Sequence, residues 1–168
     1  MVKKTILLFF VALFLVAGSV AAQTESRVAA IRKAVTQINH KQPRLTKKSF
    51  DVPNVSPEGA RAVAYFDGKI VRKIAATFFR ETGRNQIEFF YQNDNLIFAF
   101  ERELGYNEIF GKVVSVTERR YYFDNGELKS LIENKKTLSD KDSEFAEGGK
   151  QILSLSETVL QFAREAAK

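Results

Sequence analysis

The carboxylates that could do acid–base chemistry in this chain are few and closely spaced. Glu101 and Glu103 lie two residues apart in a strand-like segment, so both side chains are expected on one face. Two carboxylates in a site of low dielectric can hold different protonation states and act as acid and base. Glu88, on the preceding strand-like segment, is a third candidate. On an antiparallel sheet, Glu101 and Glu103 can instead form ordinary ion pairs with Arg119 or Arg120 of the next strand.

Other catalytic and metal-binding chemistries lack the side chains that they need. The chain contains no cysteine and one histidine, His40, which excludes a zinc-binding set and a cysteine nucleophile. No serine lies in a G-x-S-x-G motif, and Gly148-Gly149-Lys150 lacks the spacing and the preceding strand of a phosphate-binding loop. We therefore expect no catalytic residues, no metal site and no cofactor, with the three carboxylates as the alternative.

The first 22 residues have the order of a secretory signal peptide. Lys3 and Lys4 precede an unbroken apolar run, and small residues follow up to Ala22. The apolar run, Thr5 to Val16, is shorter than the roughly 20 residues that a membrane-spanning helix needs. We expect cleavage near Gln23, export to the periplasm or the medium, and contact with a membrane only through the transient signal peptide.

Residues 23–168 are predicted to form a single domain, which is long enough to bury a sizeable core. The lack of disulfides in an exported domain of this size favours a bacterial periplasm. Loss of Lys3 and Lys4 lowers the formal charge from +6 to +4, and acidic residues interrupt the basic ones along the chain. This pattern argues against a nucleic-acid partner and fits ordinary solubility, with weak attraction to anionic lipid or envelope polymer as the alternative.

A helix is predicted at each end of this domain. Residues 25–41 carry one apolar stripe at helical spacing, and Pro43 ends that helix. Residues 142–167 form the second amphipathic segment. Gly148 and Gly149 within it either delay the start of the helix or let its backbone lie close to a sheet. The stripe of the first helix consists of Val28, Ile31, Val35 and Ile38.

Strand-like segments rich in aromatic and β-branched residues fill the middle of the chain. They cover residues 60–66, 69–79, 85–92, 95–104, 112–124 and 127–134. Asp67-Gly68 and Asn125-Gly126 are two-residue hairpin signals, which predicts an antiparallel meander. Residues 43–58 hold all three prolines and are expected to form an extended connection.

Alternation along these segments places apolar side chains on both faces of the sheet. In 95–104, Leu96 is expected to share a face with Phe98 and Phe100, opposite the two glutamates. In 69–79, Val71 is expected opposite Ile74. We therefore expect the main core on one face, partial cover on the other, and a curved sheet that clasps a helix.

The loop 105–112 between two strands carries three large apolar side chains, Tyr106, Ile109 and Phe110. They either pack down as a lid on the core or form the rim of a binding groove, because loops on rigid scaffolds often carry function. This loop is the candidate binding surface.

The segment Tyr122-Phe123-Asp124-Asn125-Gly126-Glu127-Leu128-Lys129 resembles a MORN-type hairpin repeat. Shorter versions occur at residues 65–70 and 91–96. Over residues 59–165, the layout is similar to that of small uncharacterised exported bacterial proteins. The resemblance implies export and a fold, and it brings no activity and no site residues.

The sequence thus predicts an α+β domain with an N-terminal helix, an antiparallel β-meander of five to six strands, and a long C-terminal helix packed on the sheet. The expected function is that of an exported non-enzymatic protein that binds an envelope ligand or a protein partner. The alternative is a small ligand-binding or enzymatic domain with a pocket between curved sheet and helix, which would use Glu88, Glu101 or Glu103.

Overall fold

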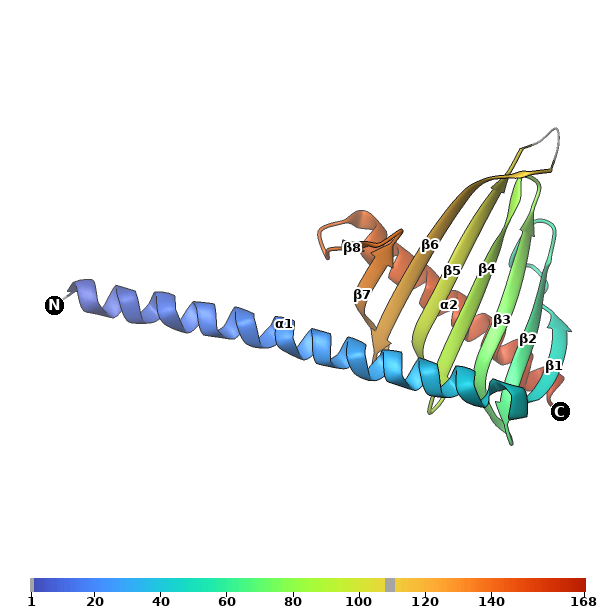
Figure 1. The fold of residues 1–168 in the computed structure, drawn as a ribbon, viewed down its shortest axis with the longest axis horizontal. Coiled ribbons are helices and arrows are strands. Elements are labelled where there is room, and N and C mark those ends of the chain that lie inside the picture. Colours follow the sequence, from blue (N-terminus) through green and yellow to red (C-terminus); the bar gives the residue numbers. More distant parts are fainter. Residues whose placement is uncertain (1, 108–110) are drawn as a thin grey trace.

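The fold is one antiparallel sheet between two helices (Figure 1). The computed structural model describes the backbone of residues 2–107 and 111–168, and side chains from residue 22 onward. Each strand pairs with the next one along the chain, which confirms the α+β class and the meander. The strands are β1 (Thr46–Asp51), β2 (Ala60–Asp67), β3 (Ile70–Arg80), β4 (Gly83–Gln92), β5 (Asn95–Tyr106), β6 (Val113–Asp124), β7 (Glu127–Glu133) and β8 (Lys136–Leu138).

The first helix, α1 (Val2–Lys41), is followed by the 3₁₀ turn η1 (Gln42–Arg44), which contains Pro43. The helix therefore ends where the proline predicts. The C-terminal half of α1 crosses one face of the sheet, called here the outer face, and its N-terminal half extends away from the sheet (Figure 1). Among the described residues, we find no helix with the length and apolar character that crossing a membrane requires.

The second helix, α2 (Ser143–Ala166), packs on the opposite face, called here the inner face. Its apolar stripe meets inward side chains of the strands from β2 to β7, and this contact makes the main core. From α2 the core includes Ile152, Val159, Leu160 and Ala163. From the sheet it includes Ile74, Ile87, Phe89, Tyr91, Phe123 and Leu131.

The glycine pair of α2 lies inside the helix, where it allows close packing against the sheet. A Cβ atom on Gly149 would lie 2.9 Å from Cδ2 and 3.2 Å from Cβ of Leu128. A Cβ atom on Gly148 would lie 3.4 Å from the Tyr121 ring, which is ordinary contact. Of the two sequence-based alternatives, close approach of the backbone is therefore the correct one.

A second apolar cluster lies between α1 and the outer face. Val28 and Ile31 of α1 are buried against a row of rings formed by Phe90, Phe98 and Tyr122. Adjacent ring centroids lie 5.6 Å and 5.0 Å apart in tilted arrangements. The sheet is thus covered on both faces, in full by α2 and in part by α1, as the alternation of apolar residues predicts.

Six of the eight strands, β2 to β7, correspond to the six predicted segments. The other two lie outside those segments, at the two edges of the sheet. β1 falls in the stretch expected to be a connection, and its side chains are exposed except for Phe50, so it shows no alternation of apolar residues. β8 has three residues and follows a tight turn at Asn134 and Lys135, which both have positive φ.

The hairpin signal at Asn125-Gly126 is confirmed, because both residues have positive φ, 51° and 79°. The turn predicted at Asp67-Gly68 lies one residue further along the chain. Asp67 pairs with Ile70, so the turn between β2 and β3 consists of Gly68 and Lys69.

Two β-bulges overturn two of the predicted face assignments. The register shifts between Tyr65 and Phe66 on β2 and between Phe90 and Tyr91 on β4, so the partner strands β3 and β5 each contain one extra residue. An extra residue moves the side chains beyond it to the other face. As a result Leu96 joins the inner core while Phe98 lies outside, and Val71 joins Ile74 on the inner face.

Candidate functional site

The two neighbouring glutamates of β5 form ion pairs with Arg119 of β6. Glu101 is directly opposite Arg119 in the strand register. Arg119 Nη1 lies 3.3 Å from Glu101 Oε2 and 3.2 Å from Glu103 Oε2, and its Nε donates to Glu133 Oε2 at 2.7 Å. The cross-strand pairing expected from the sequence is therefore confirmed for Arg119. Arg120 lies on the outer face and pairs with Glu118 at 3.0 Å.

Glu101 is a buried carboxylate whose neighbours all donate to it. It is 7% exposed and accepts hydrogen bonds from Asn85 Nδ2 at 2.6 Å and from the Tyr121 hydroxyl at 2.8 Å. Burial, followed by the charge and hydrogen bond of Glu101, raises the pKa of Tyr121, so this phenol stays protonated as a donor. With Arg119 as a third donor, Glu101 connects β5 to both of its neighbouring strands, β4 and β6.

Glu103 lies nearer to solvent in the same network. Partial burial works to raise its pKa, but hydrogen bonds from Arg80 and Arg119 outweigh it and lower the pKa below the ordinary value. The Arg80 contact measures 2.8 Å. Glu103 therefore stays ionised at neutral pH, and it does not form with Glu101 a pair of carboxyl groups that share a proton.

Glu88, the third candidate carboxylate, lies on the outer face and is separated from the other two by the sheet. Lys73 Nζ approaches Glu88 Oε1 at 2.8 Å and also donates to Asn39 at 3.2 Å and Gln42 at 3.1 Å. Lys73 is only 4% exposed, and its Nζ lies 4.9 Å from the centroid of the Phe90 ring. This buried lysine ties the C-terminal end of α1 to the sheet.

An open groove of about 770 Å³ crosses the outer face over β1 to β5. Small side chains form its floor, and charged side chains stand along it. The floor includes Ser49, Val63, Ala75 and Thr77. The charged residues are Asp51, Arg61, Glu88 and Arg102, two acidic and two basic, so the groove carries no net charge. This groove is the candidate binding site that the strand pattern did not predict, because its floor depends on which strands lie side by side.

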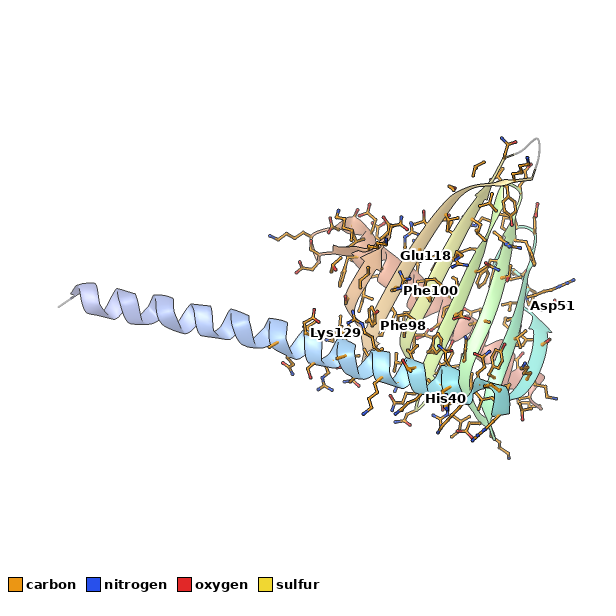
Figure 2. All side chains as sticks on the ribbon, in the orientation of Figure 1. His40, Asp51, Phe98, Phe100, Glu118 and Lys129 are labelled. Carbon is orange, nitrogen blue, oxygen red and sulfur yellow. The ribbon has the colours of Figure 1, made fainter. Side chains whose placement is uncertain are left out.

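One side of the groove is formed by an aromatic ring between arginines. The guanidinium carbons of Arg102 and Arg120 lie 5.8 Å and 4.9 Å from the centroid of the Phe100 ring. Both arginines also pair with Glu118, at 2.9 Å and 3.0 Å. Figure 2 shows Phe98, Phe100 and Glu118 on the outer face, above the crossing of α1. The ring and its arginines form a rigid wall at this side of the groove.

The loop proposed from sequence as a binding surface is described in part. Tyr106 is half-buried at the end of β5, and Ile109 and Phe110 lie outside the described residues. Beyond them, β6 begins with three exposed valines, Val113, Val114 and Val116, which are 49%, 65% and 48% exposed. The Val113-Val114 doublet in the sequence was the available signal for this exposed apolar surface.

His40 lies exposed in the last turn of α1, where a cationic side chain is favoured. Among the described residues, no group of three His, Asp or Glu side chains is placed to hold a metal ion. Comparisons of the chain with protein-family models, with curated proteins and with solved structures find no match.

Proposed function

We propose that this chain is an exported, non-enzymatic protein that binds an envelope ligand or protein partner in the groove on its outer face. The observation that carries the proposal is the groove itself, about 770 Å³ over five strands on the face that α1 covers only in part. Large exposed concave surfaces on a rigid sheet are where ligands and partners bind.

The state of the three carboxylates supports binding over catalysis. Glu101 and Glu103 share Arg119, and Glu88 is held by Lys73. A general acid or base must exchange a proton with a substrate, whereas these groups are held as ion pairs. The alternative of an enzyme with a pocket between curved sheet and helix therefore has less support.

The contacts of α1 with the sheet begin after the cleavage site that the sequence predicts. The first buried side chain on the described part of α1 is Val28, and Arg27 makes the first ion pair with the sheet, 3.6 Å from Asp124. Cleavage near Gln23 would keep both contacts. Sequencing of the N-terminus of the protein isolated from its host envelope tests this: a mature start near Gln23 is expected, and a start at Met1 would contradict it.

A substitution that fills the groove tests whether ligands bind there. Ala75→Arg places a long charged side chain on the groove floor, and Ala146→Arg makes the same change at an exposed position of α2. Both proteins are isolated from the host envelope beside the wild type, and co-purifying molecules are identified by mass spectrometry. We expect one set of molecules with the wild type and Ala146→Arg, and its loss with Ala75→Arg. The same set with all three proteins would refute the groove as the site.

A further inference from the structure

We propose that one corner of the molecule, where α1 ends, binds the surface of a membrane that contains anionic lipid. The corner consists of the last turn of α1, η1, the start of β1 and the hairpin between β2 and β3. These segments meet at the same end of the sheet (Figure 1). The proposal adds a membrane contact to the groove function and depends on that function only for export.

Sequence position concentrates the positive charge of the chain here. Residues 26–50 contain seven basic side chains and no acidic one, while the whole chain carries +6. The seven are Arg27, Arg32, Lys33, Lys41, Arg44, Lys47 and Lys48. Basic residues occur throughout the chain, but outside this segment acidic residues balance them. Four of the seven, Lys41, Arg44, Lys47 and Lys48, lie at the corner. The other three lie further back along α1, where Arg27 pairs with Asp124 at 3.6 Å.

The basic side chains of the corner are exposed and have no acidic partner. Lys41, Arg44, Lys47, Lys48 and Lys69 are all exposed, and no described carboxylate lies within ion-pair distance of them. Elsewhere arginines are paired with acids, as Arg80, Arg102 and Arg119 are. The one carboxylate of the hairpin, Asp67, pairs with Arg72 at 3.4 Å and leaves these five cations without a counter-ion. Unpaired exposed cations concentrated in one place attract anionic surfaces.

Strand register shows that these residues share one end of the sheet. Thr46 pairs with Phe66, and Phe66 pairs with Val71, so the first residues of β1 lie beside the tip of the β2–β3 hairpin. Lys41, Arg72 and Asp67 line one small hollow of about 150 Å³ between the end of α1 and this hairpin. Figure 2 shows His40 at the same end of α1. The lysines therefore lie on adjoining segments at one end of the sheet, where Lys47 and Lys48 point to opposite sides of the edge strand β1.

An exposed apolar side chain lies at the hairpin tip of this corner. Ile70, next to Lys69 at the hairpin tip, is 44% exposed. Its cross-strand partner is Asp67, whose carboxylate is paired with Arg72. An apolar residue beside a lysine suits the boundary between lipid headgroups and acyl chains, where both kinds of side chain are satisfied. A soluble anionic polymer would use the lysines and leave Ile70 in water. This combination favours a lipid surface over a polymer. An exported protein encounters membrane surfaces in the cell envelope.

Vesicle sedimentation tests the proposal. The protein, in the form that its host produces, is mixed with vesicles of phosphatidylcholine alone or of phosphatidylcholine and phosphatidylglycerol in equal parts. We expect binding to the anionic vesicles only, weakened at high salt because counterions screen the lysines. Equal binding to the neutral vesicles, or binding that salt does not change, would overturn the proposal.

Matched triple variants locate the contact. Lys41→Gln/Lys47→Gln/Lys69→Gln removes three charges from the corner, and we expect the partition coefficient to fall about a hundredfold, from about fivefold per lysine. The control Lys136→Gln/Lys141→Gln/Lys150→Gln removes three exposed lysines from the opposite end, where Asp142 and Glu144 lie nearby. We expect little change for the control, and an equal loss for both triples would overturn the location.

Two further measurements separate lipid from polymer and this corner from the groove. Ile70→Ser is expected to weaken vesicle binding severalfold with the same salt dependence. A DNA oligonucleotide can engage only the lysines, so it is expected to compete less well than anionic vesicles that offer the same concentration of phosphate. An unchanged partition for Ile70→Ser, or equal competition by DNA, would overturn the lipid assignment. Ala75→Arg should bind vesicles as the wild type does, so failure of the groove and failure of the corner give different results.

Discussion

Burial keeps two tyrosine hydroxyl groups of this protein protonated as hydrogen-bond donors. Tyr91 donates to the backbone carbonyl of Ser156 at 3.1 Å, and burial raises its pKa well above the ordinary value. Tyr121 donates to Glu101 at 2.8 Å, and burial together with that carboxylate raises its pKa as well. Ionising either phenol would bury a negative charge, and at Tyr121 it would place that charge beside another carboxylate.

These two tyrosines predict a pH dependence. Their folded pKa values lie above the unfolded value of about 10, so the unfolded state releases their protons first as the pH rises. We expect the ionisation of these two tyrosines to leave the free energy of unfolding unchanged below about pH 10 and to lower it above that pH. In an alkaline absorbance titration of the folded protein, Tyr91→Phe and Tyr121→Phe should leave the phenolate signal near pH 10 unchanged.

The control for that titration is the same protein in denaturant, where all five tyrosines should ionise near about pH 10. There, each Tyr→Phe variant should remove one fifth of the signal. Loss of signal from the folded Tyr121→Phe protein near pH 10 would show that this phenol ionises in the native state, against its place beside Glu101.

Packing of neighbouring strands depends on two glycines that face each other. Gly83 at the start of β4 pairs with Gly105 near the end of β5. A Cβ atom on Gly83 would collide with the backbone carbonyl oxygen of Leu104, whereas one on Gly105 would meet the Ser115 hydroxyl. A side-chain hydroxyl can rotate away, but a strand carbonyl cannot move without breaking its ladder.

The two alanine variants are therefore expected to differ in stability. Gly83→Ala should lower the free energy of unfolding by about 3 kcal/mol, since the backbone itself must shift. Gly105→Ala, the matched change on the partner strand, should cost less than about 1 kcal/mol because only Ser115 must turn. Urea unfolding measures both. Similar losses for the two variants would contradict the difference in their surroundings.

The whole molecule is a sheet whose two faces are covered by different means. The α2 side holds most of the buried residues, while the α1 side depends on a short stripe that includes Val28 and Ile31. Lys73 and its partners Asn39 and Gln42 add a polar tie at the end of α1. The outer cover is thus the weaker of the two layers, and it borders the open groove.

A charge placed under α1 should loosen this layer and leave the inner core folded. Ile31→Asp buries a carboxylate against the aromatic row, at a cost of about 3 kcal/mol. We expect stronger binding of a hydrophobic fluorescent dye, because Phe90, Phe98 and Tyr122 become exposed. The control, Ala29→Asp, lies on the exposed side of the same helix. Equal dye binding by the two variants would mean that α1 does not cover the row.

Features that depend on short-range patterns could be predicted from the order of residues. Strands β2 to β7, the helical stripes and the turn at Asn125-Gly126 follow from side-chain periodicity and positive φ, which neighbouring residues decide. The pairing of Glu101 with Arg119 could also be predicted, because consecutive strands of a meander lie side by side. Glu88, Glu101 and Glu103 were named from the sequence, and the ion-pair role was predicted for Glu101 and Glu103 but not for Glu88, which pairs with Lys73.

The faces and surfaces on which these elements place their side chains depend on how the strands and helices are assembled. Bulges moved Leu96 and Val71 to the inner face, since one extra residue reverses a period of two. β1 became an edge strand although it lacks an apolar alternation, because an edge needs only one neighbour for its hydrogen bonds. The groove and the basic corner join residues from separate strands and α1, and such distances are fixed only when the sheet is assembled and both helices are in place.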